Sequence, residues 1–138
     1  LCQQPVVELQ ALREKEQHYK GRADDAPPMG AERLELELES RGDVELNFAN
    51  TLILTWQQNE LRLARRSLVT GEWTYRYWTG VASRLQILCD HSSVEIFIND
   101  GEGVMSSRYF PDHPALLTLH GHAELQVRYW SLRRCMVE

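Results

Sequence analysis

Three carboxylates in the 138-residue chain, Asp90, Glu95 and Asp100, are of the residue type that acts as acid or nucleophile in hydrolysis. Glycosidic bonds, for example, are cleaved by two carboxyl groups about 5 Å apart for retention and farther apart for inversion. Glu95 alternates with Val94 and Ile96, so it lies on the opposite strand face from these apolar residues. Asp90 and Asp100 fall near strand ends, where carboxylates commonly serve turns. We therefore expect no catalytic carboxylate pair within this chain.

Histidine and cysteine spacing predicts no metal site and no cofactor. His120 and His122 lie two residues apart, which places two side chains on one strand face, but Gly121 between them favours a turn at the surface. The three cysteines cannot all pair, and none has the two-residue spacing of zinc or redox sites. A reducing compartment is the simplest inference, and Cys89, on an apolar face, is interpreted as a small buried hydrophobe.

Aromatic residues support one binding hypothesis. Trp73, Tyr75 and Tyr77 alternate along one face of an expected strand, and Trp78 lies on the other face. Flat surfaces of this kind stack on sugar rings. A strand buried against a second sheet would use the same residues as core, and this burial is the favoured interpretation.

Composition and charge exclude several classes of partner. The net charge is −5, with 6 basic and 11 acidic residues up to Glu45 and 9 of each after it. Nucleic-acid binding needs a cationic surface, so we expect no nucleic-acid partner. No apolar run approaches the roughly 18 residues of a membrane helix, and residues 1–5 do not resemble a signal peptide. We expect no membrane contact, and the lack of an initiator Met suggests a piece of a longer polypeptide.

Alternating polarity predicts strands over most of the chain. Leu34, Leu36 and Leu38 alternate with three glutamates, Glu35, Glu37 and Glu39, which predicts one face in the core and one carboxylate face in water. Further strands are predicted at residues 44–48, 51–56, 60–65, 73–78, 84–90, 93–98, 104–110, 115–119 and 123–132. Turn residues separate them, among them Asn50, Gly71, Gly80, the run 99–101 and Gly121.

These strands predict an all-β fold, an antiparallel two-sheet β-sandwich of the concanavalin A-like kind. Before them, residues 5–16 follow a proline with apolar side chains at three- and four-residue spacing, which favours a short amphipathic helix. Residues 18–30 are rich in breakers and charges and are predicted to be a loop. We therefore expect a linker with a loop at 1–30, helical or extended, and the sandwich at 31–138.

One stretch, residues 84–111, resembles the C-terminal β-sandwich module of glycoside hydrolase family 32, which includes invertases, sucrose-6-phosphate hydrolases, levanases and inulinases. The matching positions are Asp90, Ser92, Ser93, Val94, Glu95, Ile96, Phe97, Asn99, Asp100, Gly101, Glu102, Ser107, Arg108, Phe110 and Pro111. Residues 4–9 with Leu12 and Arg13 resemble the family's link between its catalytic propeller and this sandwich. Cys89 and Met105-Ser106 depart from the family pattern without changing a charge.

The family's catalytic machinery resembles a five-bladed propeller with Asn-Asp-Pro, Arg-Asp-Pro and Glu-Cys motifs, and none of these motifs occurs in this sequence. Asn99-Asp100 precedes Gly101, so the nucleophile role does not transfer to Asp100. The resemblance implies a non-catalytic, structural module of a β-fructofuranosidase, similar to those of cytoplasmic bacterial sucrose-6-phosphate hydrolases. Its expected partner is the propeller of the same polypeptide, and the isolated chain is expected to be inactive and to self-associate through an exposed interdomain face.

A free-standing, lectin-like carbohydrate-binding module remains the alternative. It would use Trp73, Tyr75, Tyr77 or Trp78 as a stacking platform for sugar. The two hypotheses differ in whether calorimetric titration with sucrose, fructose and levan oligomers shows binding that Trp73→Ala removes.

Overall fold

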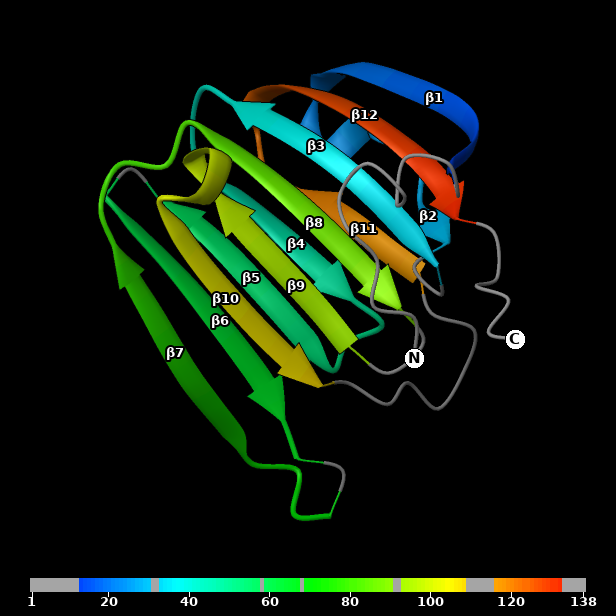
Figure 1. Ribbon diagram of the computed structural model, residues 1–138. Coiled ribbons are helices and arrows are strands. Elements are labelled where there is room, and N and C mark those ends of the chain that lie inside the picture. Colours follow the sequence, from blue (N-terminus) through cyan, green and yellow to red (C-terminus); the bar gives the residue numbers. More distant parts are fainter. Residues whose placement is uncertain are drawn as a thin grey trace.

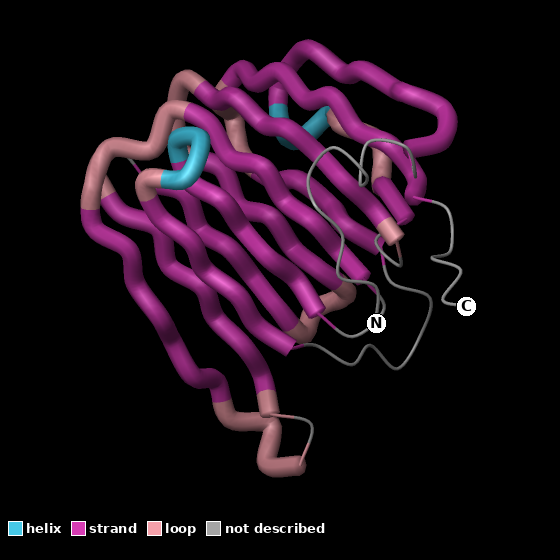
Figure 2. Tube along the Cα trace, in the orientation of Figure 1, coloured by secondary structure: helices cyan, strands magenta, loops and turns pink. Residues whose placement is uncertain are grey.

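The computed structural model describes residues 13–30, 33–57, 59–67, 69–90, 93–108 and 116–132. Within these residues the chain forms two six-stranded antiparallel sheets that pack face to face (Figures 1 and 2). Sheet A has the order β1 (Arg13–Arg22), β12 (Glu124–Leu132), β3 (Leu34–Ser40), β8 (Arg84–Asp90), β9 (Ser93–Ile98) and β10 (Gly103–Arg108). Sheet B has the order β2 (Met29–Gly30), β11 (Leu116–His120), β4 (Val44–Phe48), β5 (Leu52–Gln57), β6 (Glu60–Arg66) and β7 (Trp73–Thr79).

This architecture confirms the predicted all-β sandwich. The described part of the chain contains only two short 3-10 helices, η1 (Ala23–Asp25) and η2 (Asn99–Gly101). No helix among these residues has the length and apolar character needed to cross a membrane.

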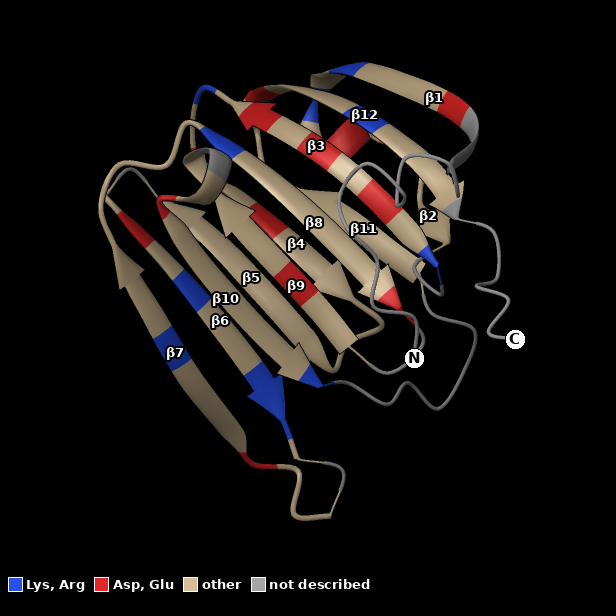
Figure 3. Ribbon diagram, in the orientation of Figure 1, with Lys and Arg blue, Asp and Glu red and all other residues tan. Residues whose placement is uncertain are grey.

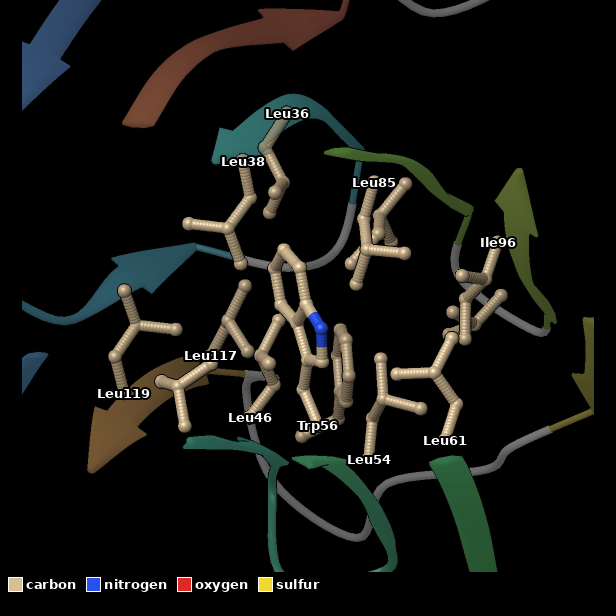
Figure 4. Packing of buried hydrophobic residues seen from close by; sticks show 14 of the residues in the cluster. Leu36, Leu38, Leu46, Leu54, Trp56, Leu61, Leu85, Ile96, Leu117 and Leu119 are labelled. Carbon is tan, nitrogen blue, oxygen red and sulfur yellow. The ribbon is translucent and has the colours of Figure 1, made fainter. Parts of the chain in front are cut away.

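The core lies between the inner faces of the two sheets. Leu36, Leu38 and Ile96 of sheet A approach Leu46 and Leu61 of sheet B, with Trp56 between the layers (Figure 4). Each fully buried aliphatic side chain of this kind contributes about 1.5–3 kcal/mol by leaving water. Cys89 is buried in this cluster, as predicted, and desolvation raises the pKa of its thiol far above the ordinary value.

Turn residues occupy the conformations that the sequence predicted. Asn50 and Asn99 have φ of 59° and 51°, and Gly101 has φ of 111°. Asparagine and glycine tolerate this left-handed region better than other residues. Asn50 therefore suits the β4–β5 turn, and Asn99 and Gly101 suit the tight β9–β10 connection.

The predictions for the N-terminal segment were wrong where the structure describes it. Residues 13–16 are not helical and residues 18–22 are not a loop, because β1 pairs antiparallel with β12 from Arg13 to Arg22. β1 is a polar edge strand held by backbone pairing, and Tyr19 packs against the core, so no apolar alternation marked it. Residues 13–30 thus contribute to both sheets instead of linking to them. Residues 5–12 of the predicted helix lie outside the described residues.

Candidate functional site

The outer face of sheet A carries a network of charged side chains from four neighbouring strands. We define it by Glu16 of β1, Arg128 of β12, Glu37 of β3 and Arg84 of β8 (Figure 3). The Arg84 Nη2 atom lies 2.7 Å from Glu37 Oε2, and Arg128 Nη2 lies 3.4 Å from the same oxygen. Arg128 also lies 3.9 Å from Glu16, so one chain of alternating charge crosses the sheet.

The predicted water-facing row of glutamates was wrong for two of its three members. Glu35 is fully buried, and its Oε2 accepts a hydrogen bond of 3.0 Å from Gln86. The Glu37 side chain is only 16% exposed, and Glu39 alone is exposed. Burying a carboxylate requires charged or hydrogen-bonding partners, and here they come from flanking strands distant in sequence. Local alternation could identify the face but not its neighbours.

Trp130 and Glu16 connect the network to the edge of the sheet. The Trp130 indole N–H donates to Glu16 Oε1 at 3.0 Å, and the Arg128 guanidinium lies 4.8 Å from the Trp130 ring centroid. His18 Nε2 lies 2.7 Å from the other oxygen of Glu16. The hydrogen bond with His18 is the largest cause and lowers the pKa of Glu16. Desolvation, the next largest effect, opposes it, and the Trp130 hydrogen bond and the charge of Arg128 lower the pKa further, so the net direction is downward.

Five residues of the family motif share this same outer face. Strand register places Asp90, Ser93 and Arg108 in one row, with Glu95 and Phe97 in the next two rows. Phe97 and Ser93 are half-buried, whereas Glu95 and Arg108 are exposed. Glu95 points away from Val94 and Ile96, as predicted, and the β8–β10 motif therefore continues the surface that the charged network begins.

Asn99 of the motif has a structural role. Its Oδ1 accepts hydrogen bonds from Ser83 N at 2.8 Å and from Arg84 N at 3.3 Å, and its Nδ2 donates to Val81 O at 2.8 Å. Its Nδ2 also donates to Glu102 at 2.7 Å. One side chain thus holds the loop between β7 and β8 against η2. Phe110, Pro111 and the side chain of Asp100 lie outside the described residues.

The aromatic strand is open to solvent on one face. Tyr75 and Tyr77 are 50% and 58% exposed on the outer face of sheet B, beside the half-buried Trp73. Trp78 lies on the inner face and packs against the core. The favoured interpretation, burial of the Trp73 face, was wrong because β7 is an edge strand whose inner positions are Thr74, Arg76 and Trp78. The four aromatic residues therefore do not form one platform.

The paired histidines have separate partners. His120 Nε2 lies 3.0 Å from Thr118 Oγ1, whereas His122 Nδ1 accepts from Arg22 at 2.6 Å and lies 3.5 Å from Asp24. Gly121 between them has φ of 136°, which is the turn that the sequence predicted. In the part of the chain that the structure describes, no three His, Cys, Asp or Glu side chains gather as a metal site.

The sequence did not reveal the charged network. Glu37 and Arg84 are 47 positions apart, and Glu37 and Arg128 are 91 apart. A usable signal was present, since Arg84 and Gln86 alternate on the polar face of their strand just as the glutamates do. That alternation became informative only once β3 was known to lie between β12 and β8.

The two-sheet sandwich with this motif on β8, β9 and β10 defines a β-sandwich module of the glycoside hydrolase type. Residues 8–131 match the family model described as "Glycosyl hydrolases family 32 C terminal", and the chain belongs to this family.

Sequence relatives show in which proteins such a module occurs. The chain is 48% identical over 138 residues to a sucrose-6-phosphate hydrolase of Klebsiella pneumoniae and 47% identical over 140 residues to that of Salmonella typhimurium. In each case all of this chain is covered, but only 29% of the relative. The chain therefore spans under a third of these relatives' length.

Solved structures share the fold at lower identity. A sucrose-6-phosphate hydrolase from Lactobacillus gasseri superimposes with a TM-score of 0.74 at 21% identity, over 94% of this chain and 30% of that one. The β-fructofuranosidase BmSUC1 of Bombyx mori gives a TM-score of 0.75 at 23% identity, over 95% and 30%. These likenesses concern the sandwich fold alone.

Proposed function

We propose that the chain acts as the non-catalytic C-terminal module of a bacterial, cytoplasmic β-fructofuranosidase of the sucrose-6-phosphate hydrolase type. Support comes from the named relatives, whose remaining length exceeds twice that of this chain. The absence from this sequence of the family's three catalytic motifs agrees with a supporting role. Its partner in this proposal is the catalytic domain of the same polypeptide.

The outer face of sheet A is the surface that packs on that domain. The single observation behind this assignment is that Asp90, Ser93, Glu95, Phe97 and Arg108 gather there. The apolar Phe97 and Leu88 lie in neighbouring rows, beside charges already held by partners. Interdomain interfaces commonly combine apolar and polar groups in this way. Charges fixed before docking lose little further freedom on contact, so they set the orientation of the two domains.

A chimera tests this assignment. The C-terminal part of the Klebsiella pneumoniae relative is replaced by this chain, whose 48% identity makes the exchange conservative. Phe97→Ala should lower the unfolding temperature of the chimera more than that of the isolated chain, because only the chimera has the interface to lose. Tyr77→Ala, on the opposite sheet, is the control and should lower both equally. Equal effects of Phe97→Ala in both settings would contradict the assignment.

Activity measurements test the non-catalytic role. We expect the isolated chain to hydrolyse neither sucrose nor sucrose 6-phosphate, whereas the chimera should hydrolyse the substrate of its catalytic domain. Turnover by the purified isolated chain that co-elutes with it on size exclusion would contradict the proposal. The same columns measure self-association, which we expect for the isolated chain and which Phe97→Ser should reduce.

A second candidate function is sugar binding by the outer face of β7. The observation that favours it is the exposure of Tyr75 and Tyr77 beside Trp73, with Arg62 lying 5.5 Å from the Tyr75 ring centroid. Calorimetric titration with sucrose, fructose and levan oligomers should then release heat that Trp73→Ala removes. If none of these sugars releases heat on titration, sugar binding is excluded and the supporting role stands as the proposed function of the module.

A further inference from the structure

A pocket opens at one end of the sandwich. At this end β3, β5 and β7 finish and β4 and β8 begin, and Figure 1 shows how these strands are arranged. Its volume is about 360 Å³, within the range of about 300–1,000 Å³ that small-molecule sites occupy. Three segments line it: residues 40–43 between β3 and β4, the end of β5 at Trp56 and Gln57, and Val81 with Ala82 between β7 and β8. It does not include the motif face or the exposed aromatic face.

Hydrogen bonds hold two of these walls in place. The Ser40 hydroxyl donates to Gly42 O at 2.9 Å, and Arg41 N donates to Glu124 O at 3.2 Å, so the first loop is fixed to β12. Asn99 holds the opposite wall through Val81 O. The pocket is therefore preformed, and a ligand would not have to order its walls.

Trp56 supplies an unused donor at the base of the pocket. Its side chain is 3% exposed and lies between the two sheets (Figure 4). The indole N–H donates to no group in the described part of the chain. Among those same residues, no buried side-chain nitrogen or oxygen lacks a hydrogen-bond partner. This N–H is therefore reached by solvent, and the pocket is the opening that Trp56 lines.

The rim offers donors and acceptors of balanced charge. The side chains of Arg41 and Asp43 are exposed, and neither forms an ion pair or hydrogen bond with the described residues. Gln57 adds an amide, and the apolar wall consists of Val81, which is 67% exposed, and Ala82. One positive and one negative charge give the rim no net attraction for an anion, so the complementary ligand is neutral.

We propose that this pocket binds a neutral saccharide unit, with its hydroxyls on Asp43, Arg41 and the Trp56 N–H. A carboxylate accepts from ring hydroxyls, a guanidinium and an indole N–H donate to ring oxygens, and the apolar C–H face of the ring rests on Val81. This site is separate from the outer face of sheet A, so it stands whether or not that face packs on a catalytic domain.

Nuclear magnetic resonance of the ¹⁵N-labelled chain tests the proposal directly, because its four tryptophans give four indole N–H signals. Fructose, glucose and sucrose are titrated separately, and inorganic phosphate serves as the anionic probe. We expect at least one of the neutral sugars to shift the Trp56 indole signal while those of Trp73 and Trp130 stay still. Asp43→Ala and Arg41→Ala should each weaken binding about tenfold, the effect of losing a charge-assisted hydrogen bond.

Tyr77→Ala is the matched control and should leave the Trp56 titration unchanged. Both rim variants replace exposed side chains without described partners, so they keep the fold, which the other backbone signals verify. The proposal is overturned if none of the three sugars shifts the Trp56 indole signal. It is also overturned if neither rim variant weakens the binding of the sugar. A shift with phosphate alone overturns the neutral-saccharide assignment, and movement confined to Trp73 assigns sugar binding to the outer face of β7 instead.

Discussion

On the outer face of sheet A, charged side chains are held in pairs and a tryptophan is buried, whereas the outer face of β7 in sheet B presents aromatic rings to solvent. Glu37 and Trp130 represent the first surface, and Tyr75 and Tyr77 represent the second. Figure 3 shows that sheet A concentrates its acidic residues on β3, while the charged residues of β6 and β7 are arginines apart from Glu60. The difference teaches that side-chain polarity alone does not indicate which surface is open.

Replacing Trp78 should give the largest difference between adjacent residues of β7. Trp78→Ala removes an inner-face ring that packs against the core and should cost about 2–3 kcal/mol of unfolding free energy. Tyr77→Ala, one position away, removes a ring that is 58% exposed and should cost under about 0.5 kcal/mol. Urea unfolding of both variants measures the contrast. Similar costs would mean that the two faces of β7 are not distinct.

Gly103 of β10 tests the same difference between the inner and outer faces of β7, because it lies beside the inner-face ring of Trp78. A Cβ at Gly103 would clash with the Trp78 indole nitrogen, and Arg76 Nη1 donates to Ser106 O at 3.0 Å across the same edge. The ring of Trp78 thus fills the space between the β7 and β10 edges. We expect Gly103→Ala to displace this ring and to cost about 1–3 kcal/mol, the usual range for overpacking, measured by the same unfolding experiment. An unchanged midpoint would mean that the ring yields without loss.

Two glutamates of β3 sharpen the comparison within sheet A. Glu37→Ala leaves Arg84 and Arg128 without their shared carboxylate and should cost about 1.5–2 kcal/mol, less than a fully buried pair because both arginines are partly exposed. Glu39→Ala, two positions along the same face, removes an exposed side chain without described partners and should change stability by under about 0.5 kcal/mol. Thermal or urea unfolding of both variants measures the difference in stability between losing a paired carboxylate and losing a solvated one. Equal losses of unfolding free energy would contradict the charged network.

Sequence alternation predicted the strands well wherever one face is apolar. The bounds 44–48, 84–90 and 93–98 agree with β4, β8 and β9 because buried apolar side chains occupy every second position there. β1 was missed because it is mostly polar and held by pairing with β12, nearly the whole chain away. Long-range backbone pairing leaves no local pattern.

The candidate surfaces were predictable only in part. The motif residues and the turn at Asn99 followed from sequence, since tight turns restrict residue type. The burial of Glu35 and the exposure of Tyr75 did not, because each depends on which strand lies beside it and on which face is covered. The pocket at Trp56 joins three segments from different parts of the chain, and no spacing rule connects them.

The smallest expected effect concerns Glu16, at the exposed edge of the charged network. Its pKa is lowered from the ordinary 4.5 in the folded chain, so its ionised form stabilises the fold above about pH 4.5, and this contribution is lost as the pH falls through the lower folded value. The Trp130 indole signal should report the titration, because its N–H donates to Glu16. His18→Gln removes the largest cause and should raise the midpoint, while Glu16→Gln should abolish the transition. If His18→Gln leaves the midpoint unchanged, the lowered pKa of Glu16 is due mainly to Trp130 and Arg128. The network would then end at β12 instead of β1.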